Sequence, residues 1–426
     1  MGGARSRRRA SPARRMPGFG WRAARPRARV LVAAALLLQG LSPTSVLGQR
    51  SGFSGSYLNL WTRVGNSLLG PASGSGFHRF RVMWAGDAGP AALDLAYEHT
   101  LSLRDPGALG AQFFTAAAGT ASGGDWLDLG GDLKTVDGIR WRHRFDRLSV
   151  RFDLGDNADL VVGRQPVSWA TTLFLTPSDP FAPFDPADPF REYRVGVDAA
   201  RLRYYRGAFT QFEVVARPAR VGLDGERTLT LLGRATTNRS GWDLGVWGGL
   251  VHDTFGAAAS LSGSVGLWAL RAEAGVRDLD DRLFARGTVG IDRTFPLAGR
   301  DLHVVIEYQR DDLGTASPDD LVAAATSRAF TQGEMQVLGR DTGALQLSWQ
   351  LHPLVSASAL VLGSLRDGSV MFGPGLSYSV TQGAGFRIGA FAGVGEDATV
   401  DGGILRFGSE YGSIPRFVYT SMNFFF

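Results

Sequence analysis

Apolar and polar residues alternate along most of the chain after residue 50, in short segments separated by glycine, asparagine, aspartate and proline. The segment 302–309 is typical, with Leu302, Val304 and Ile306 at every second position and polar residues such as Glu307 between them. Alternation with a period of two indicates β-strands that have one apolar and one polar face. No convincing helical pattern separates these segments, so the predicted fold class is all-β.

About eighteen segments show this alternation, and a count of sixteen is also compatible with it. They lie near residues 54–64, 77–85, 91–103, 137–146, 158–169, 195–206, 208–217, 228–237, 241–252, 256–265, 267–277, 283–294, 301–310, 341–352, 354–365, 369–380, 384–394 and 416–426. Each has roughly the 9–11 residues with which a tilted strand crosses a bilayer. The pattern therefore favours a transmembrane antiparallel β-barrel.

The connections between the segments support a barrel over a soluble sandwich or propeller. Short connections lie near 86–90, 154–157, 238–240, 296–300, 352–353 and 381–383, and longer ones near 65–76, 104–136, 170–194, 218–227, 311–340 and 395–415. Outer-membrane barrels have short periplasmic turns and long extracellular loops. Soluble sheets give no reason for alternate connections to be consistently short, and no blade-like repeat is present.

The first 48 residues are predicted to be a cleaved secretory signal peptide, which leaves a single barrel domain at 49–426. Ten arginines without one acidic residue precede an apolar run, Val30 to Leu38, and the small-residue pattern Val46-Leu47-Gly48 follows. This order is typical of export signals, and the apolar run is too short to span a bilayer. Removing these residues leaves 35 basic and 40 acidic ones. The high pI thus belongs to the signal and is no evidence for nucleic-acid binding.

The C-terminal segment resembles the strand that the outer-membrane assembly machinery recognises. Val418, Met422, Phe424 and Phe426 share one face, and the last residue is aromatic. An exposed edge of this kind would be prone to aggregation in a soluble domain. We therefore expect these four residues to form the assembly signal.

No catalytic or metal-binding pattern is apparent. The six histidines have no zinc-ligand spacing, and neither a G-x-S-x-G elbow nor a P-loop occurs. The chain has no cysteine, which excludes disulfides and thiolate metal sites. We expect no catalytic residue, no metal and no cofactor, although serine, histidine and aspartate residues brought together in space could still make an outer-membrane hydrolase.

Charged residues in the alternating segments are candidates for the pore lining. Arg140, Arg142 and Arg144 form a ladder on one strand face, and the other candidates are Arg201, Arg203, Arg234, Arg271, Arg286, Glu213, Glu273 and Glu307. Fixed arginine charges in a wet lumen would favour anions. Alternatively, each arginine pairs with a neighbouring acid and braces the wall.

The segment 176–190 has five prolines and three Asp-Pro pairs. Proline restricts its own φ and the conformation of the preceding residue, so this segment is a stiff loop. It follows the fifth predicted strand, and in general porins that connection folds inward. A constriction loop would place Asp179, Asp185 and Asp188 opposite the arginine ladder. A rigid surface loop, with or without a calcium ion on its acids, is the alternative.

The same region resembles a known group of barrels. Four segments are similar to segments of the porin-like group that includes alginate-export channels: Val161-Val-Gly-Arg-Gln-Pro-Val-Ser-Trp169, Thr176-Pro-Ser-Asp-Pro180, Arg191-Glu-Tyr-Arg-Val-Gly-Val-Asp198 and Arg201-Leu-Arg-Tyr204. The likeness covers about forty-five residues. It implies a pore of about eighteen strands, with Arg164 and Gln165 in the wall.

These patterns together predict a bacterial outer-membrane porin-like channel for passive diffusion of small polar or anionic solutes. The expected partners are outer-membrane lipid, lipopolysaccharide, the assembly machinery and small solutes, and no nucleic acid. A structural or adhesion barrel plugged by the segment 104–136 or 311–340 is the main alternative. The sequence does not indicate the solute or the oligomeric state.

Overall fold

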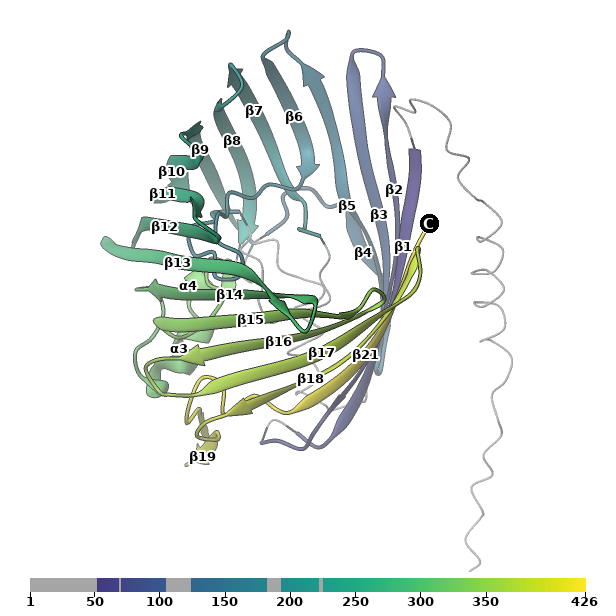
Figure 1. Ribbon diagram of the computed structural model, residues 1–426, viewed down its shortest axis with the longest axis vertical. Coiled ribbons are helices and arrows are strands. Elements are labelled where there is room, and N and C mark those ends of the chain that lie inside the picture. Colours follow the sequence, from purple (N-terminus) through teal and green to yellow (C-terminus); the bar gives the residue numbers. More distant parts are fainter. Residues whose placement is uncertain (1–51, 69, 105–123, 182–192, 222–224) are drawn as a thin grey trace, which may run out of the picture. The chain divides into compact units, whose positions relative to one another are not determined.

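The computed structural model describes residues 52–68, 70–104, 124–181, 193–221 and 225–426. Their strands form one antiparallel sheet that closes on itself, because β1 (Gly52–Val64) pairs with β2 (Ser73–Ala88) on one side and with β21 (Phe417–Phe425) on the other. Figure 1 shows the resulting ring of tilted strands. The predicted all-β barrel is confirmed, whereas the predicted signal peptide lies outside the described residues.

The sheet contains 19 strands, of which β4 (Gly130–Val136) is paired with β5 alone, so eighteen form the ring. The other fifteen ring strands are β3 (Ala91–Arg104), β5 (Ile139–Asp153), β6 (Ala158–Gln165), β7 (Val197–Arg206), β8 (Thr210–Val221), β9 (Glu226–Arg239), β10 (Trp242–Val251), β11 (Thr254–Val265), β12 (Trp268–Leu279), β13 (Arg282–Leu297), β14 (Arg300–Asp311), β15 (Asp341–His352), β16 (Val355–Ser364), β17 (Val370–Thr381) and β18 (Ala384–Val394). Each predicted segment corresponds to one of these eighteen strands.

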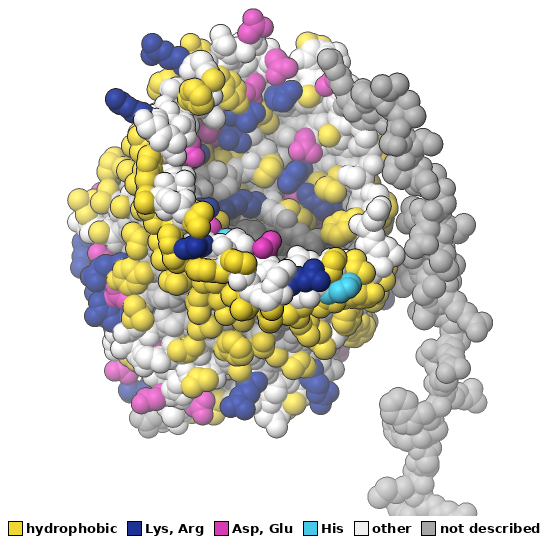
Figure 2. All heavy atoms as spheres, viewed as in Figure 1, with side chains coloured by type: hydrophobic (Ala, Val, Ile, Leu, Met, Phe, Trp, Pro, Cys, Tyr) yellow, Lys and Arg dark blue, Asp and Glu magenta, His cyan; other side chains and the backbone are white. Residues whose placement is uncertain are grey.

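Alternation along the strands separates an apolar outer face from a polar inner face. In β14, Ile306 is 46% exposed on the outer face, while the adjacent Glu307 is 2% exposed on the inner face. Figure 2 shows apolar side chains over the outside of the ring and arginine and acidic side chains within its hollow. A belt of exposed apolar side chains is unfavourable in water and suited to hydrocarbon.

The connections make the two ends of the barrel different. At one end, called the turn end, every connection has two to four residues, such as 89–90 and 154–157. The other end, called the loop end, carries the long segments 105–138, 166–196, 312–340 and 395–416. This alternation agrees with the predicted short turns and long loops.

Two loop-end connections depart from that prediction, because residues 252–253 and 280–281 join their strands directly. His252, Asp253, Asp280 and Asp281 all have φ between 48° and 69°. Two successive residues with positive φ make the tight hairpin turn whose twist matches that of the paired strands. The predicted long connection at 218–227 is also shorter, since β8 and β9 extend to Val221 and Glu226.

The remaining elements belong to the long loop-end segments. The segment 312–340 contains η1 (Pro318–Asp320), α3 (Leu321–Ala325) and α4 (Arg328–Thr331), and the segment 395–416 contains the hairpin of β19 (Thr399–Asp401) and β20 (Ile404–Arg406). Within the described ranges, no helix has the length and apolar character that a membrane span requires.

Candidate functional site

The connection after β6 folds into the barrel, and it is called the inward loop (residues 166–196, described at 166–181 and 193–196). β6 ends at Gln165, earlier than the predicted residue 169, because Pro166 has no N–H for the sheet. The side-chain amide of Gln165 instead donates hydrogen bonds to the carbonyls of Val161 and Ala199. Trp169 and Phe181 of the loop are buried and pack in a T-shape with their ring centroids 4.8 Å apart.

Two glutamates on the far side of the ring hold the inward loop. Glu307 accepts hydrogen bonds from the backbone N–H groups of Leu173, Phe174 and Leu175 at 2.6, 3.0 and 2.8 Å. Glu273 accepts from two further loop N–H groups at 3.2 and 3.3 Å. Their strands, β14 and β12, lie eight and six positions from β6 in a ring of eighteen. The loop therefore crosses the lumen and reaches the opposite wall.

Next to this anchor, an apolar cluster fills one part of the lumen. Leu175 is fully buried among inward side chains of β1, β2, β16, β17, β18 and β21. Its neighbours include Leu60 and Phe77, and Val337 and Tyr411 add apolar surface from the segments 312–340 and 395–416. The part of the lumen next to these strands is thus a packed core and not a water-filled space.

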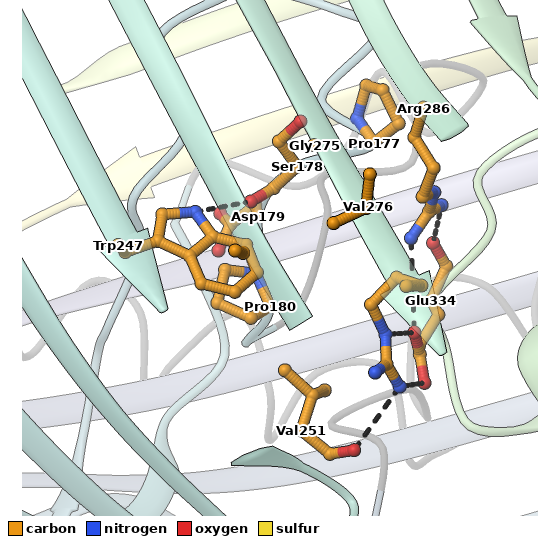
Figure 3. A pocket seen from close by; sticks show the side chains of 12 residues that line it. Pro177, Ser178, Asp179, Pro180, Trp247, Val251, Gly275, Val276, Arg286 and Glu334 are labelled. Atoms are coloured by element: carbon orange, nitrogen blue, oxygen red, sulfur yellow. Dashed lines mark hydrogen bonds and ion pairs between the residues drawn. The ribbon is translucent and has the colours of Figure 1, made fainter. Parts of the chain in front are cut away.

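The segment 312–340 fixes the same loop from the loop end. The Gln336 side chain accepts from the N–H of Thr176 at 2.5 Å and donates to the carbonyl of Phe174 at 2.8 Å. Close by, Glu334 accepts from Arg277 at 2.7 and 2.9 Å. Figure 3 shows Glu334 beside Arg286, with Pro177–Pro180 and Trp247 facing the same space, whose volume is only about 10 Å³. Two loops and the wall therefore form one tightly packed unit.

The predicted ladder lies on β5, and each of its three arginines has an acidic neighbour. Arg140 and Arg142 share Asp132 of β4, at 3.1 and 3.8 Å, and remain 45% and 36% exposed. Arg144 lies deeper, with contacts of 3.1 Å to Glu98 and 2.8 Å to Asp146. Arg140 and Arg142, the two arginines nearer the loop end, share one carboxylate, so their positive charge is only partly balanced.

Most of the other predicted arginines are also paired. Arg201 contacts Glu213, Arg203 contacts Asp159 at 2.7 Å, Arg271 contacts Asp292, and Arg286 contacts Asp311 at 2.7 Å. Glu213 additionally accepts from the indole N–H of Trp169 at 3.1 Å. In contrast, no described carboxylate lies within ion-pair distance of Arg234, whose guanidinium lies 5.5 Å from the Trp169 ring centre.

Of the three acidic residues predicted to form a constriction, only Asp179 lies within the described residues. Asp179 is buried and contacts Ser168 at 2.8 Å and Arg194 at 2.9 Å. It therefore braces the inward loop, and none of the described residues that it contacts belongs to the β5 ladder, opposite which it was expected to lie. Asp185 and Asp188 lie outside the described residues.

Sequence reasoning missed a second charged group on β2, β3 and β5. Arg81 contacts Glu98 and, at 2.7 Å, Asp146, and its guanidinium lies 3.7 Å from the ring centre of Tyr193. Arg79 lies 4.8 Å from the same ring. Burial raises the pKa of the Tyr193 phenol, so it stays neutral. The signal was present in the sequence, because residues 79–82 alternate between arginine and an apolar residue.

A polar cavity of about 360 Å³ lies at the turn end. Its lining includes Arg234, Thr171 of the inward loop, and the hydroxyl groups of Thr236, Ser260 and Ser262. These groups can form hydrogen bonds with water or a solute. Asp243 also lines it, so the described lumen joins a wet, polar part that contains both signs of charge to the apolar cluster.

The predicted assembly residues lie in the last strand of the ring. Val418 and Met422 are exposed on the outer face, and the Phe424 ring stacks on Tyr57 at 6.3 Å. Phe426 stacks on Phe80 at 6.0 Å, and its N–H donates to Gly55. These contacts close the barrel, and the assembly role itself stays a prediction. Among the described residues, no cluster of three or more metal-ligating side chains occurs.

Comparison with known proteins reveals the fold. No family model and no curated protein matches the chain. Among solved structures, it is similar to OccAB4 of Acinetobacter baumannii, with 9% identity, a TM-score of 0.52 and coverage of 90% of this chain and 100% of that one. OpdK of Pseudomonas aeruginosa, solved with vanillate, is 12% identical, with a TM-score of 0.50 and coverage of 88% of this chain and 98% of that one. A BenF-like porin from Pseudomonas fluorescens Pf-5 is 11% identical, with a TM-score of 0.51 and coverage of 88% of this chain and 98% of that one. The chain shares their barrel architecture.

Proposed function

We propose that this chain is an outer-membrane channel through which small polar or anionic solutes diffuse passively. The observation that carries the proposal is an asymmetry among the charged side chains of the lumen. Arg140 and Arg142 keep 45% and 36% of their side chains exposed, whereas the three predicted lining glutamates are covered. A solute in the lumen would therefore meet positive charge.

The three predicted lining glutamates illustrate this asymmetry. Glu213, Glu273 and Glu307 are each 4% exposed or less. Glu273 and Glu307 accept backbone N–H groups of the inward loop, and Glu213 accepts from Arg201 and Trp169. Carboxylates used in this way cannot coordinate a passing cation. They were predicted to line the pore, and we now propose that they position the loop.

The arginines provide the remaining charge. Arg140 and Arg142 share one acid at the loop end, and Arg234 faces the turn-end cavity. Between these positions, Arg79, Arg81 and Arg144 accompany two carboxylates, those of Glu98 and Asp146; Arg79 and Arg81 are buried, and Arg144 keeps 17% of its side chain exposed. We propose that an anion passes from Arg140 and Arg142 at the loop end to Arg234 at the turn end, along the side of the inward loop that faces these arginines.

A second function, a plugged structural or adhesion barrel, is favoured by a different observation. The apolar cluster around Leu175 fills the lumen beside β1, β2, β15–β18 and β21, and Val337 of the segment 312–340 belongs to it. If the lumen were filled everywhere in this way, no solute would pass. No observation among the described residues favours the hydrolase alternative.

Bilayer recording of the refolded chain 49–426 distinguishes these functions. We expect open-channel steps and, in a salt gradient, a reversal potential that reports anion preference. A refolded barrel that never conducts would contradict the channel and favour the plug. A reversal potential of cation-selective sign would contradict the anionic preference and leave the channel intact.

The membrane setting belongs to the same proposal. The apolar outer face suits lipid and lipopolysaccharide, residues 1–48 would direct export, and Val418, Met422, Phe424 and Phe426 would be read by the assembly machinery. The N-terminal sequence of the chain recovered from outer membranes tests the cut after Gly48. Deletion of Phe426 should reduce the folded fraction there.

The finer kinship with alginate-export channels rests on the segments around Arg164 and Gln165. Arg164 forms a two-bond pair with Asp198 at 2.8 Å and donates to the Leu127 carbonyl. These contacts support a structural role for this arginine in the wall. Block of the current by short uronic-acid oligomers would favour the kinship, and an unchanged current would contradict it.

A further inference from the structure

A group of polar side chains lies on the outer face of the barrel, where the rest of the wall is apolar. It is called the outer polar patch and comprises Tyr57, Asn59, His78, Tyr97, His99, Trp141 and His143 on β1, β2, β3 and β5. Three of the six histidines of the chain are in this patch.

Alternation places these residues on the outside. Leu58 and Leu60 of β1 point into the apolar cluster of the lumen, so Tyr57 and Asn59 point outward. Arg79 and Arg81 of β2 face Tyr193 of the inward loop, which leaves His78 on the outer face. The same argument, from inward Glu98 and Arg144, places His99 and His143 outside.

The strand register gives the depth of the patch. One row across the wall contains Tyr57, Phe80, His99 and His143. Four residues away toward the loop end is the row of Trp61, and four residues away toward the turn end is the row of Trp84. Aromatic residues of this kind mark the two membrane interfaces of outer-membrane barrels. Tyr57 and Phe80 thus lie between the two interfaces along their strands, and His99 and His143 continue the same row on β3 and β5.

Apolar neighbours on both sides confirm that this depth is not interfacial. Toward the loop end, the outer row contains Leu103 and Ile139, and toward the turn end it contains Leu95 and Leu148. In the middle of β15, β16 and β17, an outer row contains Leu347, Ala359 and Pro374, none of which is polar. The polar patch is therefore a local feature of one wall.

The hydrogen bonds within the patch leave donors facing outward. The indole N–H of Trp141 donates to Nδ1 of His99 at 3.2 Å, so the proton of a neutral His99 ring is on Nε2. Nδ1 of His78 lies 2.8 Å from the Tyr57 hydroxyl, and Nδ1 of His143 lies 3.1 Å from that of Tyr97. For the described residues, no hydrogen bond to Nε2 of these three rings is found. An N–H without an acceptor in hydrocarbon costs several kcal/mol.

A lipid chain offers no acceptor at this depth, whereas a second copy of this chain does. Copies inserted in the same orientation are related by an axis along the membrane normal, so equal depths meet. The polar row of one copy then faces the polar row of the next, where Tyr hydroxyls and the Asn59 carbonyl can accept. Polar side chains within a membrane usually pair in this way. We propose that the outer polar patch is the contact surface of a symmetric homo-oligomer.

The test is the mass of the refolded chain 49–426 in mild detergent, measured by native mass spectrometry or sedimentation equilibrium. We expect a multiple of the single-chain mass. The variant His78→Phe/His99→Phe/His143→Phe should shift it to one chain, because phenylalanine suits lipid and has no N–H. The matched control, Ile306→Phe/Leu347→Phe/Leu376→Phe, makes three replacements by phenylalanine elsewhere on the outer wall and should remain associated. A single-chain wild type, or a histidine variant that stays associated, would overturn the proposal.

A second measurement covers a histidine variant that fails to refold. The chain lacks cysteine, so Leu101→Cys, within the patch, and Ile388→Cys, on the outer face of β18, are single reactive sites. A bis-maleimide should link copies of Leu101→Cys and not of Ile388→Cys. Equal linking at both sites, or none at Leu101→Cys, would contradict the contact. This inference rests on the membrane setting of the proposed function and not on solute passage. A protein that conducts as a single chain would therefore contradict the proposed oligomer and leave the proposed channel function intact.

Discussion

Glu307 is the strongest single anchor of the inward loop, and its replacement tests how the lumen is narrowed. The carboxylate accepts three backbone N–H groups, those of residues 173–175, at 2.6–3.0 Å. In Glu307→Gln, one oxygen is replaced by an NH₂ group that cannot accept, and the charge is lost. A hydrogen bond to a charged group contributes about 1.5–3 kcal/mol.

We therefore expect the docked loop to lose about 3 kcal/mol relative to an undocked one, which changes their ratio about a hundredfold. Gln336 and Leu175 still hold the tip, so the barrel itself should fold. Single-channel recording should show a larger mean conductance or new transitions to a more open level. A matched control is Asp292→Asn, which removes an inward charge on β13 that pairs with Arg271 and not with the loop.

The result that refutes this reasoning is specific. If Glu307→Gln has the conductance and the current noise of the wild type, the loop does not depend on this carboxylate. If Asp292→Asn changes the conductance by the same amount, the effect comes from charge in the lumen and not from loop docking. Either outcome would contradict the assignment of Glu307 as a positioning residue.

Three further expectations follow from the geometry. Replacing Arg140, Arg142 and Arg144 together by Gln should move the reversal potential toward zero. Most of the change should already be present in Arg140→Gln/Arg142→Gln, because Arg144 is paired with two carboxylates. An unchanged reversal potential would count against a role for the ladder in selectivity. Leu175→Ala should lower the denaturation midpoint by an amount equivalent to about 2–5 kcal/mol, since this side chain is fully buried, and a midpoint within error of the wild type would contradict the packed cluster. Burial lowers the pKa of His252, in the 252–253 turn, to about 4. The unfolded chain then binds the extra proton first, so stability should fall as the pH drops from 6.5 to 4, by about 3 kcal/mol, and His252→Gln should remove that part of the unfolding profile.

The strands could be predicted because alternation is a local property. Each of the eighteen segments needs only its own neighbours to show which side chains share a face, and an apolar face as long as a bilayer crossing has few other uses. The strand predicted at 158–169 is four residues shorter in the structure, because it ends where Pro166 removes a donor from the sheet. The two-residue connections at 252–253 and 280–281 were missed because His-Asp and Asp-Asp are weaker turn signals than Asn-Gly.

The lumen was less predictable than the wall. Alternation correctly placed Glu273 and Glu307 on the inner face, but it could not show that backbone N–H groups of the inward loop occupy them. Similarly, inward Leu58 and Leu60 look like residues that break the polar pattern until Leu175 is seen to cover them.

The sequence alone thus determined the all-β class, a strand count of sixteen to eighteen and the inner or outer position of most side chains, since these depend on a period of two along one strand. Only the tertiary structure decided which inner groups meet across the lumen. Leu173 and Glu307 are 134 residues apart, and their contact depends on ring closure, strand stagger and the path of a loop. Those three properties are set by all the strands together, so no local pattern encodes them.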